Sequence, residues 1–304
     1  MTTLPDTEQF QELRPLLFSI AYRMLGSATE AEDVVQDAYL RYAAAPREDV
    51  RSPRSYLSTV VNRLCLDHLK SGRSRREQYV GPWLPEPVVT TGRADDPLRE
   101  VEKQETVTLA FLRVLEALSP SERAVFLLRE VFEYPYEEIA GVLELTPANC
   151  RQLFHRAKDR VQQERPRFHP APEQQQQLIG QFLQAIQEGS VHEFEALLAQ
   201  EVTFHSDGGG KVSAARKPVY GRHAVARFLF AIAQLAREVA GFTFTVEPVN
   251  GVSGLVAWNG EQLDSIYALQ IADDQITSIE AIRNPDKLTY ANRQLQRHAS
   301  SVRR

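Results

Sequence analysis

The hydrophobic period of this 304-residue chain changes once, at the proline- and glutamine-rich segment RPRFHPAPEQQQ (165–176). Before this segment, apolar residues recur at the three- and four-residue spacing of amphipathic helices. After it, helical runs give way to alternating runs such as GFTFTVEPV and ITSIEAIRN, which have the two-residue period of strands. A second proline-rich segment, within 80–108, interrupts the helical part. The sequence therefore predicts a multidomain protein with two all-α domains followed by an α+β domain.

The composition shifts place the boundaries of these parts. We expect a first helical domain at 1–80, a linker at 81–108, a second helical domain at 109–164, a linker at 165–175, an α+β domain at 176–290 and a basic tail at 291–304.

The first domain contains a helix with an acidic face. TEAE (29–32) predicts a capping box with Thr29 as the N-cap. In the following helix Asp33, Gln36 and Asp37 share one face, because they are three or four residues apart. Like charges at this spacing destabilise an isolated helix slightly. From these residues alone the face is typical of a solvated helix, and a basic partner surface is the alternative.

A basic helix follows, with Ser52 as its cap and Pro53 at its first position. Its apolar stripe leaves Asn62, Arg63 and the tail KSGRSRR on the outside. Residues 63–76 hold five basic residues against one acidic residue. Such a surface suits phosphates and unstacked bases.

The sequence of the second domain predicts a helix-turn-helix. Ser119, Pro120 and Glu122 agree as start signals of one helix, and Thr146 with Pro147 start another. On that last helix an apolar face at helical spacing lies opposite a face of polar and basic side chains. Such a helix enters the major groove, where Asn and Gln pair with adenine and Arg with guanine.

Charge is strongly segregated along the chain, although the net charge is −5. Residues 147–167 hold six basic and two acidic residues, whereas 86–144 hold thirteen acidic and six basic ones. With the basic run at 63–76, this pattern indicates a chain that contacts a polyanion at two places.

The segments AEDVVQDAYLRY, SYLSTVVNRLCLDHLK and LSPSERAVFLLREVFEYPYEEIAGVLELTPANCRQLFHRAKDRV resemble, in that order, regions 2 and 4 of extracytoplasmic-function RNA polymerase sigma factors. The resemblance implies binding of core RNA polymerase through Asp33, Gln36 and Asp37, and promoter DNA as the second partner. It implies contacts to the −10 element from Asn62, Arg63, Lys70, Arg73, Arg75 and Arg76. It implies contacts to the −35 element from Asn149, Arg151, Gln152, His155, Arg156 and Lys158.

The third part resembles the SnoaL-like branch of the NTF2-like cone fold. WLPEP (83–87), DGGGK (207–211) and NPDKL (284–288) match motifs of the SigJ-like subset of these sigma factors, which carries this extra domain. The glycine loop matches neither the phosphate-binding loop nor the dinucleotide fingerprint. We therefore assign it to a regulatory contact with the sigma domains or with polymerase, formed by Asp207, Gly208, Gly209, Gly210, Lys211, Asn284, Pro285, Asp286 and Lys287.

Other functions have less support. We expect a cytoplasmic protein without a membrane span, and core positions for the two cysteines, Cys65 and Cys150. We expect no catalytic residue, no metal, no cofactor and no separate anti-sigma factor; a small-molecule ligand of the C-terminal domain is left open. The alternatives are a one-component ligand-sensing regulator, and a cone-fold isomerase or cyclase that uses His205 or Asp207 as a base.

Overall fold

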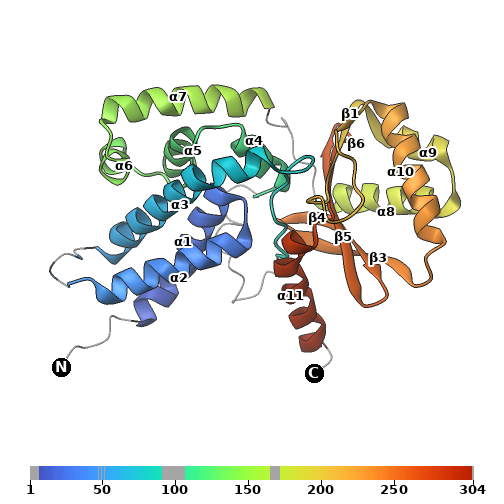
Figure 1. Cartoon of the computed structure of the whole chain (residues 1–304). Helices are drawn as coiled ribbons and strands as arrows, with labels where there is room; N and C mark the ends of the chain where they lie inside the picture. Colours follow the sequence, from blue (N-terminus) through green and yellow to red (C-terminus); the bar gives the residue numbers. More distant parts are fainter. Residues whose placement is uncertain are drawn as a thin grey trace. The chain divides into compact units, whose positions relative to one another are not determined.

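The structure is a computed structural model that describes residues 7–46, 48, 50, 52–90, 107–164 and 172–302; within these ranges the side chains at 72–77, 164, 172–173 and 298–302 are not described. The chain forms two compact units (Figure 1). The first comprises Met1–Glu77, Thr90–Val107 and Phe111–Arg165. The second comprises Gln78–Val89, Thr108–Ala110 and Pro166–Arg304.

The first unit begins with three helices, α1 (Thr7–Leu25), α2 (Ala28–Ala44) and α3 (Pro53–Glu77). Gly26 follows α1 with φ at 67°, as expected for a glycine that ends a helix. The prediction that Thr29 caps α2 is wrong. Ser27 is extended and its side chain accepts a hydrogen bond from the Glu30 backbone N–H, so the helix has already begun at Thr29. Cys65 is fully buried, as predicted.

The helix-turn-helix part of the first unit contains α4 (Leu109–Glu116), α5 (Pro120–Phe126), the π-helical η2 (Leu127–Val131), α6 (Tyr136–Leu143) and α7 (Pro147–Glu164). The predicted capping box at Ser119 and Glu122 is present. Thr146 accepts a hydrogen bond from the backbone of Asn149, as expected for the cap of α7. The predicted α6–turn–α7 arrangement is confirmed.

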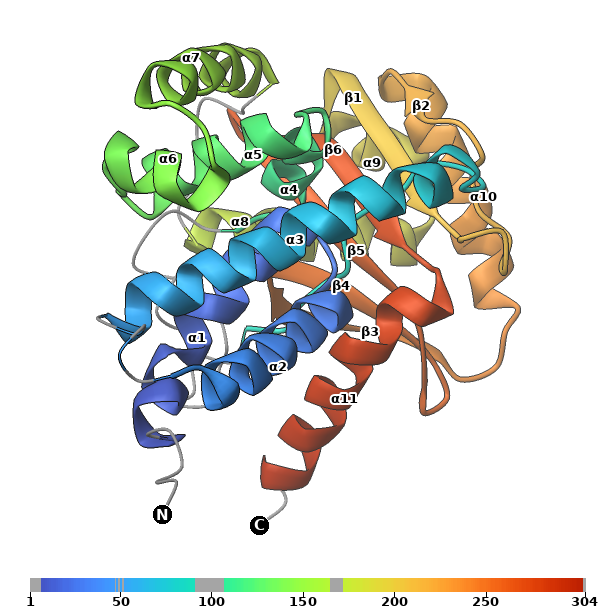
Figure 2. The same ribbon diagram turned by 60° about the vertical axis from the view of Figure 1, so that its left-hand side comes forward.

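The two helical parts pack on each other within the first unit (Figure 2): α3 contacts α5 and α6, and α1 contacts α5 and η2. Arg123 of α5 is only 2% exposed. Its guanidinium donates to the backbone oxygen of Met24 at 2.7 Å and pairs with Glu116 at 2.6 Å. A buried guanidinium needs several acceptors, and this one finds one of them in the N-terminal helices.

The second unit is a curved sheet with helices on its concave face, which confirms the predicted α+β cone (Figure 1). Its helices are α8 (Pro172–Glu188), α9 (Val191–Ala196), α10 (Arg222–Arg237) and α11 (Pro285–Val302). Its strands are β1 (Leu198–Asp207), β2 (Val219–Tyr220), β3 (Phe242–Val249), β4 (Val252–Asn259), β5 (Gln262–Ala272) and β6 (Gln275–Ile282). Their order is β2-β1-β6-β5-β4-β3. The core lies between the sheet and α8, α9 and α10.

The pairing of β1 with β6 is parallel, whereas the other pairs are antiparallel. Asp207 at the end of β1 lies beside Ile282 at the end of β6. Parallel neighbours end at the same edge of a sheet. The loop after β1, which holds DGGGK, therefore meets the segment after β6, which holds NPDKL.

Residues 291–304, predicted as a basic tail, belong to α11 as far as Val302. Ala291 and Leu295 are buried, and the helix contacts β5. The sequence reasoning missed this helix because its apolar positions were too few to stand out beside the polar residues. Within the described ranges, no helix is long and apolar enough to span a membrane.

Candidate functional site

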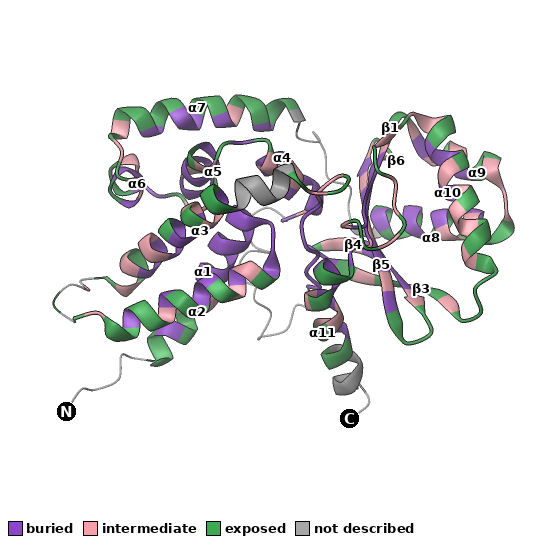
Figure 3. Cartoon of the chain, viewed as in Figure 1, coloured by how far each residue is buried: buried purple, intermediate pink, exposed green. Residues whose placement is uncertain are grey.

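The acidic face of α2 is on the surface of the first unit (Figure 3). Asp33, Gln36 and Asp37 are all exposed, while Val34 and Val35 on the opposite side are buried. Leu40 follows on the same exposed face and is 58% exposed. This face presents two carboxylates, an amide and an apolar side chain, which suit a partner surface with basic and apolar groups.

The outer face of α7 presents the residues predicted to read DNA. Asn149, Arg151, Gln152, His155 and Arg156 are exposed, and Lys158 is half-exposed. The opposite face of the helix is buried, which orients these side chains outward. A row of amide and guanidinium groups on one helix face is suited to base edges and phosphates in a major groove.

The cations of this face are already paired inside the domain. Arg156 and Arg160 both contact the carboxylate of Glu122, at 3.3 and 3.2 Å. Burial alone would raise the pKa of Glu122, but the hydrogen bonds from Ser119 and the charges of both arginines outweigh it, so its pKa is lowered. One carboxylate therefore caps α5 and also positions the arginines of α7.

The middle of α3 differs from the prediction. Asn62, predicted to face outward, is fully buried and donates to the backbone oxygen of Ser58 at 2.8 Å. The apolar stripe did not reveal this, because Asn62 lies at its margin, where another part of the unit can extend the buried face. Arg63 is exposed but bound to Glu144, and Lys70 is exposed. The side chains of Arg73, Arg75 and Arg76 lie outside the described residues.

The second unit contains a polar cluster built from the motifs DGGGK and NPDKL. We call Asp207, Asn284 and Lys287 the clamp, and residues 78–89 the strap. Asp207 is fully buried, and its carboxylate accepts four hydrogen bonds from described residues. The donors are Tyr79 Oη at 2.6 Å, the Leu84 backbone N–H at 2.9 Å, the Gly209 backbone N–H at 3.0 Å and Lys287 Nζ at 2.7 Å.

Lys287 and Asn284 complete the grip on the strap. The ammonium of Lys287 donates to the Leu84 backbone oxygen and lies 3.9 Å from the centre of the Trp83 ring, a favourable cation–π geometry. Asn284 Nδ2 donates to Tyr79 Oη at 2.9 Å. Burial and, as a smaller cause, the hydrogen bond to Asp207 raise the pKa of Tyr79. The hydroxyl therefore keeps its proton and donates a hydrogen bond to Asp207.

The glycines of DGGGK are required by space and by backbone conformation. A Cβ at Gly208 would lie 2.6 Å from the Val212 backbone oxygen. Gly209 has φ at 59°, and a Cβ there would lie 2.3 Å from Asn284 Nδ2. The loop is therefore closely packed against the clamp. Lys211 and Asp286 form an exposed ion pair at 2.6 Å.

The strap is attached at a second place, further along. The backbone of Val88 exchanges two hydrogen bonds with Asn250, through its side chain at 3.0 Å and its backbone at 2.8 Å. The backbone of Val89 exchanges two with the side chain of Gln294, at 2.8 and 3.0 Å. Leu84, Val88 and Val89 are buried. Residues 81–89 of the predicted linker 81–108 are thus bound to the C-terminal unit, and 91–106 lie outside the described residues.

Sequence reasoning missed Tyr79, Asn250 and Gln294. No local pattern marks them, since each acts through one contact with a residue distant in sequence. Trp83 did give a signal, because a tryptophan in a proline-rich segment indicates docking. Among the residues that the structure describes, no group of three or more His, Cys, Asp or Glu could hold a metal ion.

Comparisons with known proteins agree with this arrangement. Residues 9–76 match the model of Sigma-70 region 2, and residues 108–161 match that of Sigma-70, region 4. The chain is 36% identical over 292 residues to the ECF RNA polymerase sigma factor SigJ of Mycobacterium tuberculosis, covering 93% of both chains. It is 32% identical over 290 residues to the probable ECF sigma factor SigI of the same species, covering 93% of this chain and 95% of that relative.

A solved structure resembles the whole chain. The crystal structure of Mycobacterium tuberculosis SigJ superposes with a TM-score of 0.77 at 34% identity, and the match covers 94% of this chain and 99% of that one. The residues matched by the two family models contain the exposed faces of α2 and α7. The chain therefore belongs to the extracytoplasmic-function RNA polymerase sigma factors.

Proposed function

We propose that the C-terminal domain regulates this sigma factor in cis, by holding the strap that leads from region 2 toward region 4. The observation that carries the proposal is the buried carboxylate of Asp207, which binds Tyr79, Leu84 and Lys287 at once. The strap follows α3 directly in the sequence, so its attachment limits the path available to the segment that joins the two DNA-reading regions.

The reading surfaces themselves are assigned as follows. Asp33, Gln36 and Asp37 on α2 bind core polymerase, with Leu40 as an added apolar contact. The exposed face of α7 reads the −35 element, and the basic end of α3 contacts the −10 element. The exposure of the α2 and α7 faces supports these assignments. The protein acts in the cytoplasm, and the clamp takes the place of a separate anti-sigma factor.

A catalytic role of the glycine loop has no support from the geometry. A general base needs a free carboxylate oxygen within reach of a substrate proton. Both oxygens of Asp207 are occupied, and the residue is fully buried. We therefore propose that the domain is not an enzyme, and that Asp207 serves to hold the strap.

Run-off transcription with core polymerase tests the proposal. Deletion of residues 170–304, and separately Asp207→Asn, should change promoter-dependent output. Unchanged output in both variants would refute regulation by the clamp. Asp273→Asn is the matched control, because it makes the same change at an exposed residue in the turn between β5 and β6. Co-purification with core polymerase separates this function from that of a one-component regulator.

A further inference from the structure

Residues of region 4 contact the middle of α3 within the first unit. Tyr134 Oη donates to Ser58 Oγ at 2.9 Å, and both residues are buried. One and a half turns along the helix, Arg63 donates from Nε to the Val142 backbone oxygen at 3.4 Å and pairs with Glu144 at 3.0 Å. The segment 58–63 is therefore held by region 4 at both ends.

Asn62 lies inside this segment, and only one of its two polar side-chain atoms forms a hydrogen bond with a described residue. Its Nδ2 donates to the Ser58 backbone oxygen, but its Oδ1 is buried and accepts no hydrogen bond from any described residue. A buried acceptor without a partner is unfavourable, because its hydration is lost without replacement. Asn62 lies one turn after Ser58, on the side of α3 that Tyr134 contacts, so undocking of region 4 would open this side of the helix to water or to nucleic acid.

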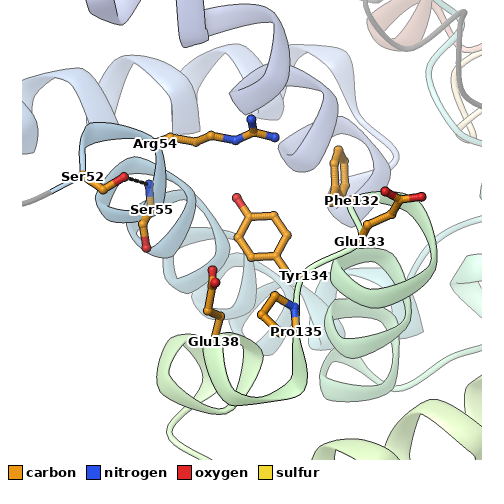
Figure 4. A pocket seen from close by; sticks show the side chains of 8 residues that line it. All are labelled: Ser52, Arg54, Ser55, Phe132, Glu133, Tyr134, Pro135 and Glu138. Atoms are coloured by element: carbon orange, nitrogen blue, oxygen red, sulfur yellow. Dashed lines mark hydrogen bonds between the residues drawn. The ribbon is translucent and has the colours of Figure 1, made fainter.

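The contact between α3 and region 4 reaches the surface at the start of α3. An open pocket of about 250 Å³ lies there (Figure 4). Its lining residues are Ser52, Arg54 and Ser55 on the α3 side, and Phe132, Glu133, Tyr134, Pro135 and Glu138 on the region 4 side. Most of them are exposed, so solvent reaches the edge of this contact.

Arg63 binds the carboxylate of Glu144 as it would bind a phosphate group. Guanidinium groups bind carboxylates and phosphates in the same way, through charge-assisted hydrogen bonds. Glu144 follows α6 as its C-cap, in the left-handed conformation with φ at 56°. With the ion pair to Arg63 formed, its side chain is 75% exposed. The carboxylate of Glu144 is thus bound to the guanidinium of Arg63, the group that a DNA phosphate would contact.

We propose that region 4 covers the middle of α3 in the free chain, and that promoter DNA competes with Tyr134 and Glu144 for this face. The inference rests on the proposed reading of the −10 element by α3. The docking of region 4 on α3 is a contact inside one unit and can be measured without DNA. The docking and the proposed reading of the −10 element can therefore fail separately.

A thiol at the covered position measures the cover directly. In full-length Asn62→Cys protein, a maleimide should label the new thiol slowly, and the parent protein sets the background because Cys65 and Cys150 are buried. Adding Glu144→Lys and Tyr134→Phe should raise the labelling rate about tenfold, since one ion pair and one hydrogen bond are lost. Rapid labelling of Asn62→Cys without these changes would overturn the cover.

Glu137→Lys is the matched control. It makes the same charge change in α6, at a side chain that is 69% exposed and pairs with Arg151 instead of α3. It should leave labelling unchanged; equal acceleration by both lysine variants would show a general charge effect and overturn the assignment to Glu144.

Binding of a single-stranded −10 oligonucleotide, with Asn62 intact, tests the competition. Tyr134→Phe with Glu144→Lys should bind it several-fold more tightly than Tyr134→Phe with Glu137→Lys. Accelerated labelling with equal oligonucleotide affinity would keep the cover and refute its competition with DNA.

Discussion

The ion pair between Asp207 and Lys287 makes the most demanding prediction. Both side chains are nearly inaccessible, at 0% and 8% exposure, and the pair also holds Tyr79 and the backbone of Leu84. Asp207→Ala leaves the ammonium of Lys287 buried without its counter-charge. Removal of one partner from a buried pair typically costs ~3–5 kcal/mol. The free energy of unfolding of the second unit should therefore fall by about that amount.

The same pair allows a compensation test. Asp207→Asn with Lys287→Met removes both charges and leaves a neutral, similarly sized pair. Replacement of both partners of a buried pair is often nearly neutral, so the double variant should be more stable than Asp207→Ala by at least ~2 kcal/mol.

Trp83 provides the assay, because its ring lies against Lys287 in the strap. In a Trp258→Phe background, urea unfolding followed by fluorescence reports Trp83 alone, since the chain has two tryptophans. A cost below ~1 kcal/mol for Asp207→Ala, or a double variant no more stable than Asp207→Ala, would show that the clamp does not depend on charge pairing.

Three further predictions follow from single sites. Glu122→Gln should destabilise region 4 by ~1–3 kcal/mol. Because the pKa of Glu122 is lowered, the contribution of its charge is present above the unfolded value near ~4.3 and is lost as the pH falls through the folded pKa. Thermal melts at pH 7 and pH 3 should therefore differ less in the variant than in the parent protein. Gly209→Ala should cost at least ~1 kcal/mol because of its positive φ and the contact with Asn284, whereas Gly141→Ala, with open space around the Cβ, should be neutral or stabilising in the same melts. Arg151→Ala and Arg156→Ala should each lower affinity for duplex −35 DNA by about fivefold to a hundredfold in fluorescence anisotropy, while pull-down of core polymerase stays intact; loss of both would indicate misfolding.

The sequence was informative about the exposed faces of α2 and α7. Asp33, Gln36 and Asp37 are exposed because their spacing places them opposite an apolar stripe, and the outer face of α7 follows the same rule. Caps such as Ser119 and Thr146 could be read directly, because a cap and its helix are adjacent in the chain.

Most helices and strands, the caps Ser119 and Thr146, and the family were thus determined by local pattern and motif. The burial of Asn62 and the four hydrogen bonds of Asp207 were decided by tertiary structure alone. The docking of region 4 on α3 and the parallel pairing of β1 with β6 join segments that are far apart in the chain. A period of two or of 3.6 residues specifies which side of an element is apolar, but it carries no information about which distant element covers a polar group at its margin.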